Sequence, residues 1–471
     1  MLVSAILRHH DHQGGNVKRL RTGVLLAALA VSVLAVGCGR SDSGGSSSSS
    51  PTTADASAKC KNVTLESTEI GVSSSEITVE TMADTGSSLA PGLFQANIDA
   101  MNAFAKWVNA NGGVGCRQLK VQTWDSKLSP DEAKNGLING CKTSLAMVGG
   151  NSLFNPDTTT LTNCPDKAGQ PIGLPNFAAL ANDVNEQCNP NTWNIQAVAE
   201  ECKTTSGTRT LRSIVGPVDY YKTLEPNLTG VFLVPGDLPT TVQSATYNIA
   251  AQQQDGVKWL NSYKVSGRSE QSAFTPYIQA AKAGNANYMY MGSNDAAQIK
   301  LRKEAAAQGF NPKIWACSLA CYTQNFRDAG SVVDGTYVWM QFLPFEEASY
   351  NETLKTYVDA VGGKPDSFGA QAWQAGLIFK ATIDKIVAEQ GPNAITRATV
   401  LKTMMSITDF DAGGWATKKG PKDVGTCFVV MQINGGKFER KYPQQPGTLA
   451  CDPKNVATVT LDPQVEAAKI S

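Results

Sequence analysis

Stretches that predict β-strands alternate with stretches that predict α-helices along much of this chain. The first strands are predicted at 77–82, 119–124 and 145–150, with helices between them at 94–108 and from Ser129 onward. Consecutive strands that are joined through a helix run parallel, and a parallel sheet is covered by helices on both faces. The sequence therefore predicts an α/β fold.

The same alternation returns in the second half of the chain. Strands are predicted at 230–234, 257–265, 287–292 and 335–342, helices at 240–253, 274–283, 295–308 and 368–389, and a β-hairpin at 428–440. The hairpin turn is Asn434-Gly435-Gly436, and these residue types suit a tight turn. We therefore expect two α/β lobes in series.

The first 38 residues have the features of an export signal. A short basic cluster precedes an uncharged apolar run at 23–36, which is shorter than the about 20 residues that a membrane span needs. The run ends in Leu34-Ala-Val-Gly-Cys38, which resembles the lipobox of bacterial lipoproteins. We expect removal of 1–37, lipidation of Cys38 and a Ser/Gly-rich tether at 38–58. A plain cleaved signal or a short anchor helix is the alternative.

The charge balance and the histidines exclude several classes of function. Lys and Arg total 41, as do Asp and Glu, so the chain lacks the basic excess of typical nucleic-acid binders. Its histidines, His9, His10 and His12, all lie in the segment that we expect to be removed. Residues 1–16 precede a signal that is already complete from Val17, which suggests a misassigned start. A mature chain without histidine has no Ser-His-Asp triad and no His-ligated metal site.

The cysteine count agrees with export. Eleven cysteines minus Cys38 leave an even number, as disulfides in an oxidising compartment require. Short sequence separation favours the pairs Cys116–Cys141 and Cys427–Cys451, and Cys317–Cys321 is possible as a tight loop. The remaining cysteines would then pair among themselves; they are Cys60, Cys164, Cys188 and Cys202.

Several segments, taken in order, resemble one family. They are Trp107–Val114, Gly115–Val121, Asp125 with Ser129 and Pro130, Val148–Gly150, Phe274–Ile278 and Gln371–Gly376. In this order the body of the chain resembles the type I solute-binding proteins of ATP-driven (ABC) importers. The most similar branch is the one that binds branched-chain amino acids, amides and urea.

The resemblance implies two Rossmann-like lobes joined by three crossovers, the periplasmic binding protein type I or Venus-flytrap architecture. Lobe 1 is expected at 59–197 plus 318–425, and lobe 2 at 198–317 plus 426–471. The ligand would bind in the cleft between the lobes, which close around it by a hinge motion.

Loops at the carboxyl ends of parallel strands hold the candidate ligand groups. The candidates are Asp84, Ser87 and Ser88 in the first loop, Asn151 and Ser152 after the third strand, Asn176 and Phe177 in the next loop, Asn294 and Asp295 in the second lobe, and Trp373 as an aromatic wall. The resemblance implies that Asn151 and Ser152 bind a carboxylate and that Asp295 pairs with an ammonium. The structural alternatives are a surface turn for the first loop, a helix cap for Ser152 or Asp295, and the core for Trp373.

From these features we expect an extracytoplasmic lipoprotein that captures a small polar molecule, such as an amino acid or amide, and delivers it to an ABC permease. We expect a monomer without cofactor, metal ion or enzyme activity. A ligand-sensing receptor or a surface adhesin on the same fold is the alternative. An exported enzyme is less favoured, because the sequence has no GxSxG and no Walker A motif.

Overall fold

The computed structural model describes residues 58–471, with gaps at 89, 197–201, 203–206 and 293. The chain divides into two units, 1–49 and 50–471, and every element described here lies in the second. The predicted signal, Cys38 and the tether up to residue 57 lie outside the described residues, as does the expected lobe boundary at 197.

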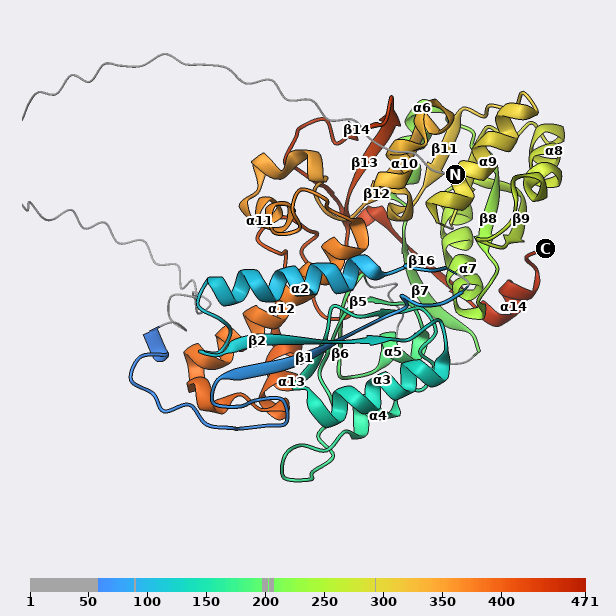
Figure 1. Ribbon diagram of the computed structural model, residues 1–471. Helices are drawn as coiled ribbons and strands as arrows, with labels where there is room; N and C mark the ends of the chain where they lie inside the picture. The colour runs from blue at the N-terminus through green and yellow to red at the C-terminus, as the bar shows by residue number, and fades with distance from the viewer. Residues whose placement is uncertain (1–57, 89, 197–201, 203–206, 293) are drawn as a thin grey trace, which may run out of the picture. The chain divides into compact units, whose positions relative to one another are not determined.

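Six strands form the first sheet, in the order β2-β1-β3-β5-β4 with β6 beside β5 (Figure 1). They are β1 (Glu76–Ala83), β2 (Gln118–Asp125), β3 (Ala146–Val148), β4 (Asn151–Ser152), β5 (Asn176–Ala181) and β6 (Thr192–Gln196). Every pairing between them is parallel. Their carboxyl ends therefore lie along one edge of the sheet.

Helices cover both faces of this sheet. The helices α2 (Gln95–Ala110) and α12 (Ser367–Gln390) pack together on one face, and α3 (Pro130–Thr143) packs on the other (Figure 1). The start of α3 is as predicted, because the Ser129 side chain accepts a hydrogen bond from the Glu132 N–H (3.4 Å). Further helices are α4 (Thr159–Asn163), α5 (Val184–Cys188), α11 (Glu352–Ala360) and α13 (Arg397–Ser406).

Eight strands form the second sheet, in the order β14-β13-β12-β11-β10-β8-β9 with β15 beside β13. They are β8 (Thr229–Pro235), β9 (Lys258–Val265), β10 (Tyr288–Met291), β11 (Ile314–Cys317), β12 (Thr336–Met340), β13 (Cys427–Asn434), β14 (Lys437–Tyr442) and β15 (Ala450–Cys451). The strands β8 to β12 pair in parallel, whereas β13 and β14 add an antiparallel edge.

Helices also cover both faces of the second sheet. The helices α6 (Gly216–Leu224) and α7 (Pro239–Gln254) pack on one face, and α8 (Thr275–Ala283) and α9 (Asp295–Ala307) pack on the other. Two short helices are α10 (Gln324–Asp328) and α14 (Pro463–Ala468). The 3₁₀ turns are η1 (Gln271–Phe274), η2 (Leu319–Cys321), η3 (Gly330–Val333), η4 (Phe345–Tyr350), η5 (Pro392–Ala394) and η6 (Pro453–Asn455).

The chain passes between the two sheets three times. It leaves the first sheet after β6, returns after β12 to form α12 and α13, and leaves again to form β13. The expected lobe 1 segment 318–425 therefore starts too early. Strand β12, at 336–340, pairs with β11 and β13, so its backbone hydrogen bonds belong to the second sheet.

The strands and helices that the sequence predicted are confirmed, with ends within two residues of the predicted ones. Two strands that it did not predict form a third, small sheet. They are β7 (Arg209–Ile214) and β16 (Val456–Leu461), and they pair antiparallel.

The disulfides differ in part from the predicted pairs. The five bonds are Cys60–Cys116, Cys141–Cys164, Cys188–Cys202, Cys317–Cys321 and Cys427–Cys451. The pairs Cys427–Cys451 and Cys317–Cys321 are confirmed, but the pair Cys116–Cys141 is wrong. Helix α3 packs against α4, whose C-cap is Cys164, and this contact brings Cys141 to Cys164. Cys116 precedes the edge strand β2 and bonds instead to the N-terminal Cys60.

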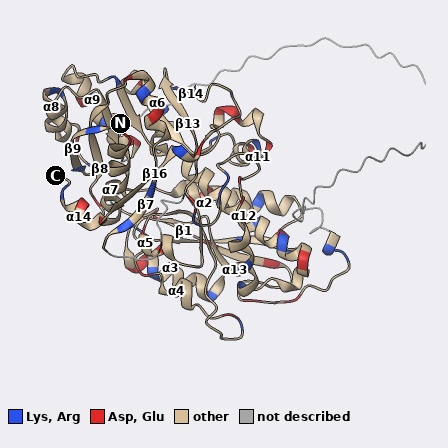
Figure 2. Cartoon of the chain, turned by 180° about the vertical axis from the view of Figure 1, so that it is seen from behind, with Lys and Arg blue, Asp and Glu red and all other residues tan. Residues whose placement is uncertain are grey.

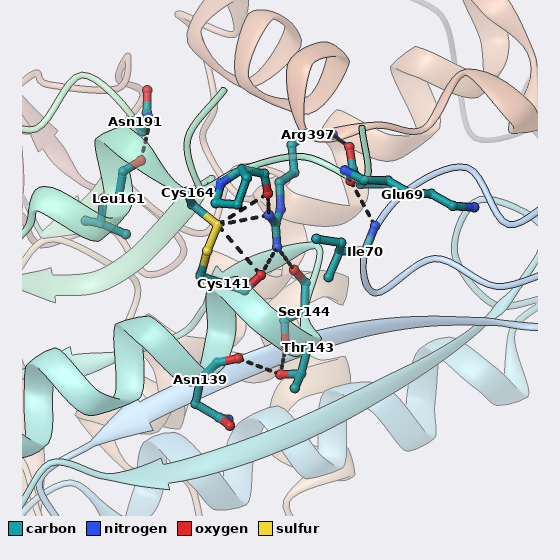
Figure 3. The surroundings of a disulfide bond; sticks show 12 residues. Glu69, Ile70, Asn139, Cys141, Thr143, Ser144, Leu161, Cys164, Asn191 and Arg397 are labelled. Atoms are coloured by element: carbon teal, nitrogen blue, oxygen red, sulfur yellow. Dashed lines mark hydrogen bonds between the residues drawn. A yellow bond between two sulfur atoms is a disulfide. The ribbon is translucent and has the colours of Figure 1, made fainter. Parts of the chain in front are cut away.

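A buried arginine lies beside the Cys141–Cys164 disulfide (Figure 3). Arg397, at the start of α13, donates hydrogen bonds to the backbone oxygens of Cys141 (2.7 Å) and Ser144 (2.6 Å) and to Cys164 Sγ (2.9 Å). Both backbone oxygens lie at the C-terminal end of α3, where the helix dipole favours a positive charge. Burial lowers the pKa of Arg397, and Glu69 opposes this effect. Arg397 therefore connects α13 to α3 across a long sequence separation.

Glu80 on β1 makes the stability of the fold depend on pH. Its side chain is fully buried, accepts one hydrogen bond from Asn139 (2.5 Å) and leaves Oε1 without a partner. Burial raises the pKa of Glu80 from 4.5 to about 7, against the lowering effect of Asn139. Because the folded state holds this proton more tightly than the unfolded state, the contribution of Glu80 to stability falls as the pH rises from 4.5 to about 7.

We predict that Glu80→Gln is more stable than the wild type above pH 7, by up to about 3 kcal/mol. The difference should vanish below the unfolded-state pKa of 4.5, where both side chains are neutral. Urea unfolding at acidic and at mildly alkaline pH measures this. Glu76→Gln, at the exposed start of the same strand, is the control. An equal gain at both pH values would contradict the prediction.

Candidate functional site

A pocket of about 830 Å³ lies at the carboxyl ends of strands from both sheets. From the first sheet it is lined by Leu128 and Leu153, which follow β2 and β4, and by Asn182 and Gln196 at the ends of β5 and β6. From the second sheet it is lined by Pro235, Gly292, Ser318 and Gln341, at or after the ends of β8, β10, β11 and β12. This is the edge at which parallel sheets bind ligands.

The wall of this pocket is mainly apolar. Its large apolar and aromatic side chains are Leu93, Phe94, Leu128, Leu153, Leu180, Ile214, Phe232, Leu238, Tyr247, Tyr290, Leu319, Trp339 and Phe368. Among the described residues of the wall, the acidic ones are Asp237, Asp295 and Asp366, and Arg212 is the only basic one. Basic and acidic residues are interspersed along the described chain (Figure 2). An apolar wall with a few polar groups is typical of small-molecule sites.

Asp84 fixes the loops at the first-sheet side of the pocket. Its buried carboxylate accepts hydrogen bonds from Ser126 Oγ (2.6 Å), Leu128 N (2.8 Å) and Leu153 N (2.8 Å). Burial raises the pKa of Asp84, although these three hydrogen bonds oppose the shift and Asp125 adds to it. One carboxylate thus holds the two leucines that line the pocket.

Asp125, at the end of β2, holds the neighbouring loop. Its Oδ1 accepts hydrogen bonds from the backbone N–H groups of Thr85, Gly86 and Lys127, each at 3.0 Å. Partial burial would raise the pKa of Asp125, but these backbone donors outweigh it and lower the pKa. In the same loop Leu128 has a φ of 55°, a left-handed backbone conformation that is unfavourable for leucine. A side chain at Gly86 would meet the Asp125 carboxylate at 2.2 Å, so only glycine fits there.

The other candidates of the first loop and of the loop after the third strand do not line the pocket. Ser87 is buried and Ser88 is exposed. Asn151 and Ser152 form β4, so Ser152 is not a helix cap. Both side chains are buried, and the polar side-chain atoms of both have no hydrogen-bond partner. A ligand role for these residues stays a prediction.

Asn176 and Phe177 were expected in a loop after a strand, and this is wrong. They begin β5, at the end of the strand away from Asn182, which does line the pocket. Asn176 donates to Glu186 Oε1 (2.9 Å), and burial raises the pKa of Glu186 to about 7. Phe177 lies in the core against Phe379.

Asn294 and Asp295 are the sequence candidates that line the pocket. The helix cap is Asn294, whose side chain accepts a hydrogen bond from Ala297 N (2.9 Å). Asp295 follows at the first position of α9, and its Oδ2 accepts from Thr323 Oγ1 (2.6 Å) and Asn325 Nδ2 (3.1 Å). The N-cap of α9 is therefore Asn294 and not Asp295, for which the sequence had allowed this role.

Trp373 belongs to the core and not to an aromatic wall. Its ring on α12 is fully buried and packs against Phe104, Trp107 and Tyr357 at centroid distances of 5.1, 5.5 and 5.5 Å. The aromatic residues of the pocket are instead Phe94, Phe232, Tyr247, Tyr290, Trp339 and Phe368. None of these was predicted from the sequence as a pocket residue, and neither was Arg212, because its strand β7 was not predicted. The alternating segment Arg209–Ile214 was the available signal.

The described residues contain no group of three or more Cys, His, Asp or Glu that could hold a metal ion. In the same part of the chain, no helix is both long and apolar enough to cross a membrane.

Comparisons with known proteins agree on one family. A family model described as "Periplasmic binding protein" matches residues 81–437. A search of curated protein sequences finds no match.

Similar solved structures include a leucine-binding protein from Thermotoga maritima, with 11% identity and a TM-score of 0.58 over 80% of this chain and 99% of that chain. A solute-binding protein from R. palustris in complex with benzoate has 13% identity and a TM-score of 0.59 over 80% and 98%. A fatty acid ABC transporter substrate-binding protein from Thermomonospora curvata has 15% identity and a TM-score of 0.55 over 80% and 97%. At these identities the similarity shows the fold, which is the type I periplasmic binding protein fold with two α/β lobes.

We predict that Asp84→Asn lowers the free energy of unfolding by about 1–3 kcal/mol. The asparagine amide would place an N–H donor against the hydroxyl and N–H donors from which the Asp84 carboxylate accepts. The loops that carry Leu128 and Leu153 should also lose their fixed positions, so affinity for any pocket ligand should fall. Urea unfolding and calorimetric titration measure the two effects. Asp99→Asn, an exposed carboxylate on α2, should change stability by less than about 0.5 kcal/mol. Equal effects of the two substitutions would contradict the assigned role of Asp84.

Proposed function

Because this chain belongs to the periplasmic binding protein family, we propose that it captures a small organic solute in the 830 Å³ pocket and delivers it to an ABC permease. The proposal includes export, lipid anchoring through Cys38 and binding without catalysis. The sequence favours a polar solute such as an amino acid or amide, and Asn294 and Asp295 are its proposed contacts in the second lobe.

The position of the pocket is the observation that supports this proposal most. Groups from the strand ends of both sheets line it, so a ligand there contacts both lobes at once. Such a ligand binds more tightly when the lobes approach each other, and it therefore shifts the population toward the closed form. We propose that the permease recognises this closed, loaded form.

A thermal-melt screen of the oxidised chain against small metabolites tests the proposal. A ligand at 100 times its dissociation constant adds about 2.7 kcal/mol of stability, which raises the melting temperature by several degrees. Ala296→Trp should abolish this shift, because Ala296 is exposed at the start of α9 and lines the pocket. Ala306→Trp, exposed on the same helix but away from the pocket, should keep it. If no compound shifts the melt and native mass spectrometry finds no carried-over ligand, the proposal fails.

The lipid anchor has a separate test, because it rests on the lipobox-like sequence at 34–38. We predict that cells supplied with labelled palmitate label the chain and that it sediments with membranes. Cys38→Ala should remove both the label and the sedimentation, since the acceptor sulfur is lost. Ser41→Ala, in the same tether, should keep both. Label that persists in Cys38→Ala would contradict lipidation at this residue.

A further inference from the structure

Two hydrogen-bond donors in the pocket wall lack a partner. Arg212 Nε, on β7, and Asn182 Nδ2, just after β5, are buried atoms without a hydrogen bond in the described part of the chain. A buried donor without an acceptor destabilises the protein, and the penalty is larger for a charged group. An acceptor on a bound ligand would remove this penalty at both positions.

A short series of hydrogen bonds connects Asn182 to β7, the strand that carries Arg212. Asn182 Oδ1 accepts from Ser244 Oγ on α7 (3.1 Å). One turn along α7, Asn248 Nδ2 donates to Ser244 O (3.1 Å), and Asn248 Oδ1 accepts from Ser213 Oγ (2.5 Å). Ser213 is the neighbour of Arg212 on β7, and successive side chains of a strand point to opposite faces, so the Arg212 side chain points away from α7. Arg212 and Asn182 nevertheless both line the pocket.

The acidic residues of the pocket accept hydrogen bonds from donors of the chain itself. Asp366 caps α12 by accepting from Phe368 N (2.8 Å) and Gly369 N (3.3 Å). Asp295 accepts from Thr323 and Asn325, and Asp237 accepts from Gly267 N (2.7 Å). Arg212 is the only cation among the described residues of the wall, and its buried Nε has no hydrogen-bond partner there. Among the charged side chains of the described wall, Arg212 is therefore the one with a buried donor left for a ligand.

From these observations we propose that Arg212 binds the carboxylate of the ligand, and that this ligand is an organic acid with a hydrocarbon body. The inference rests on the proposed function and names the class of solute. A guanidinium presents several donors in a planar fork, which matches the two oxygens of a carboxylate. Asn182 Nδ2 supplies a further donor from the other sheet. The hydrocarbon body lies along the leucine and aromatic side chains of the wall, whose burial drives its binding.

Calorimetric titration of the full, oxidised chain with matched acids and amides tests this inference. The probes are hexanoate, octanoate and 3-phenylpropanoate, each with its primary amide, which keeps the shape but loses the charge. We expect at least one acid to bind, and to bind at least about tenfold more tightly than its amide. Arg212→Gln should weaken the acid by at least about tenfold and leave the amide nearly unchanged. Asn182→Ala should weaken binding of the acid less than Arg212→Gln does, because it removes a neutral donor and not a charged one.

The control is Arg268→Gln, because Arg268 is an exposed arginine that does not line the pocket. The Arg268→Gln variant should bind the acid as tightly as the wild type does. Unchanged circular dichroism and an unchanged melting temperature without ligand show that each variant is folded. An acid that binds no better than its amide, or that binds Arg212→Gln unchanged, would overturn the inference.

The test separates this inference from the proposed function. If no acid binds but another solute of the metabolite screen does, the inference is wrong and the proposed function stands. If no solute of any class binds, the proposed function fails and the inference fails with it.

Discussion

The carboxylate of Asp84 fixes the geometry on which the first-sheet side of the pocket depends. Parallel strands end along one edge, but the loops that follow them have no repeating hydrogen bonds to hold them. A buried carboxylate only accepts hydrogen bonds, so it can hold donors from two separate loops at once. Here it holds the N–H groups of Leu128 and Leu153, and Leu128 keeps a backbone conformation that is unfavourable for leucine. Asp125 acts on the adjacent loop in the same way.

The secondary structure could be predicted because its signals are local. The apolar stripe of α2, the cap and proline that begin α3, and the turn of the β13–β14 hairpin all lie within a few residues of what they specify. Contacts between distant segments could not be predicted in the same way. Cys141 pairs with Cys164 because α3 packs on α4, and β12 joins the second sheet because β13 pairs with it from far along the chain.

The sequence located the site by its loops but not by its side chains. The rule that ligands bind at carboxyl ends of strands indicated the loops that follow the first three predicted strands, and each of them contributes to the pocket wall, with Ala90, Leu128 and Leu153 among the lining residues. It does not say which way a side chain in such a loop points. Asp84 turns toward neighbouring backbone, whereas Leu128 and Leu153 face the pocket. Asn294 and Asp295 were predicted from the family resemblance, which implies an acid just after a strand of the second lobe.

The disulfides have a mechanical consequence. Among the described residues, each disulfide closes a loop of at most 56 residues, and none joins an element of the first sheet to one of the second. Such bonds restrict the unfolded chain and so stabilise each half against heat and proteolysis. They put no covalent tie across the three passages between the halves. The disulfides thus cross-link the chain within each half and leave the connections between the halves without such bonds. A fully oxidised protein therefore keeps the freedom for a motion of one half relative to the other.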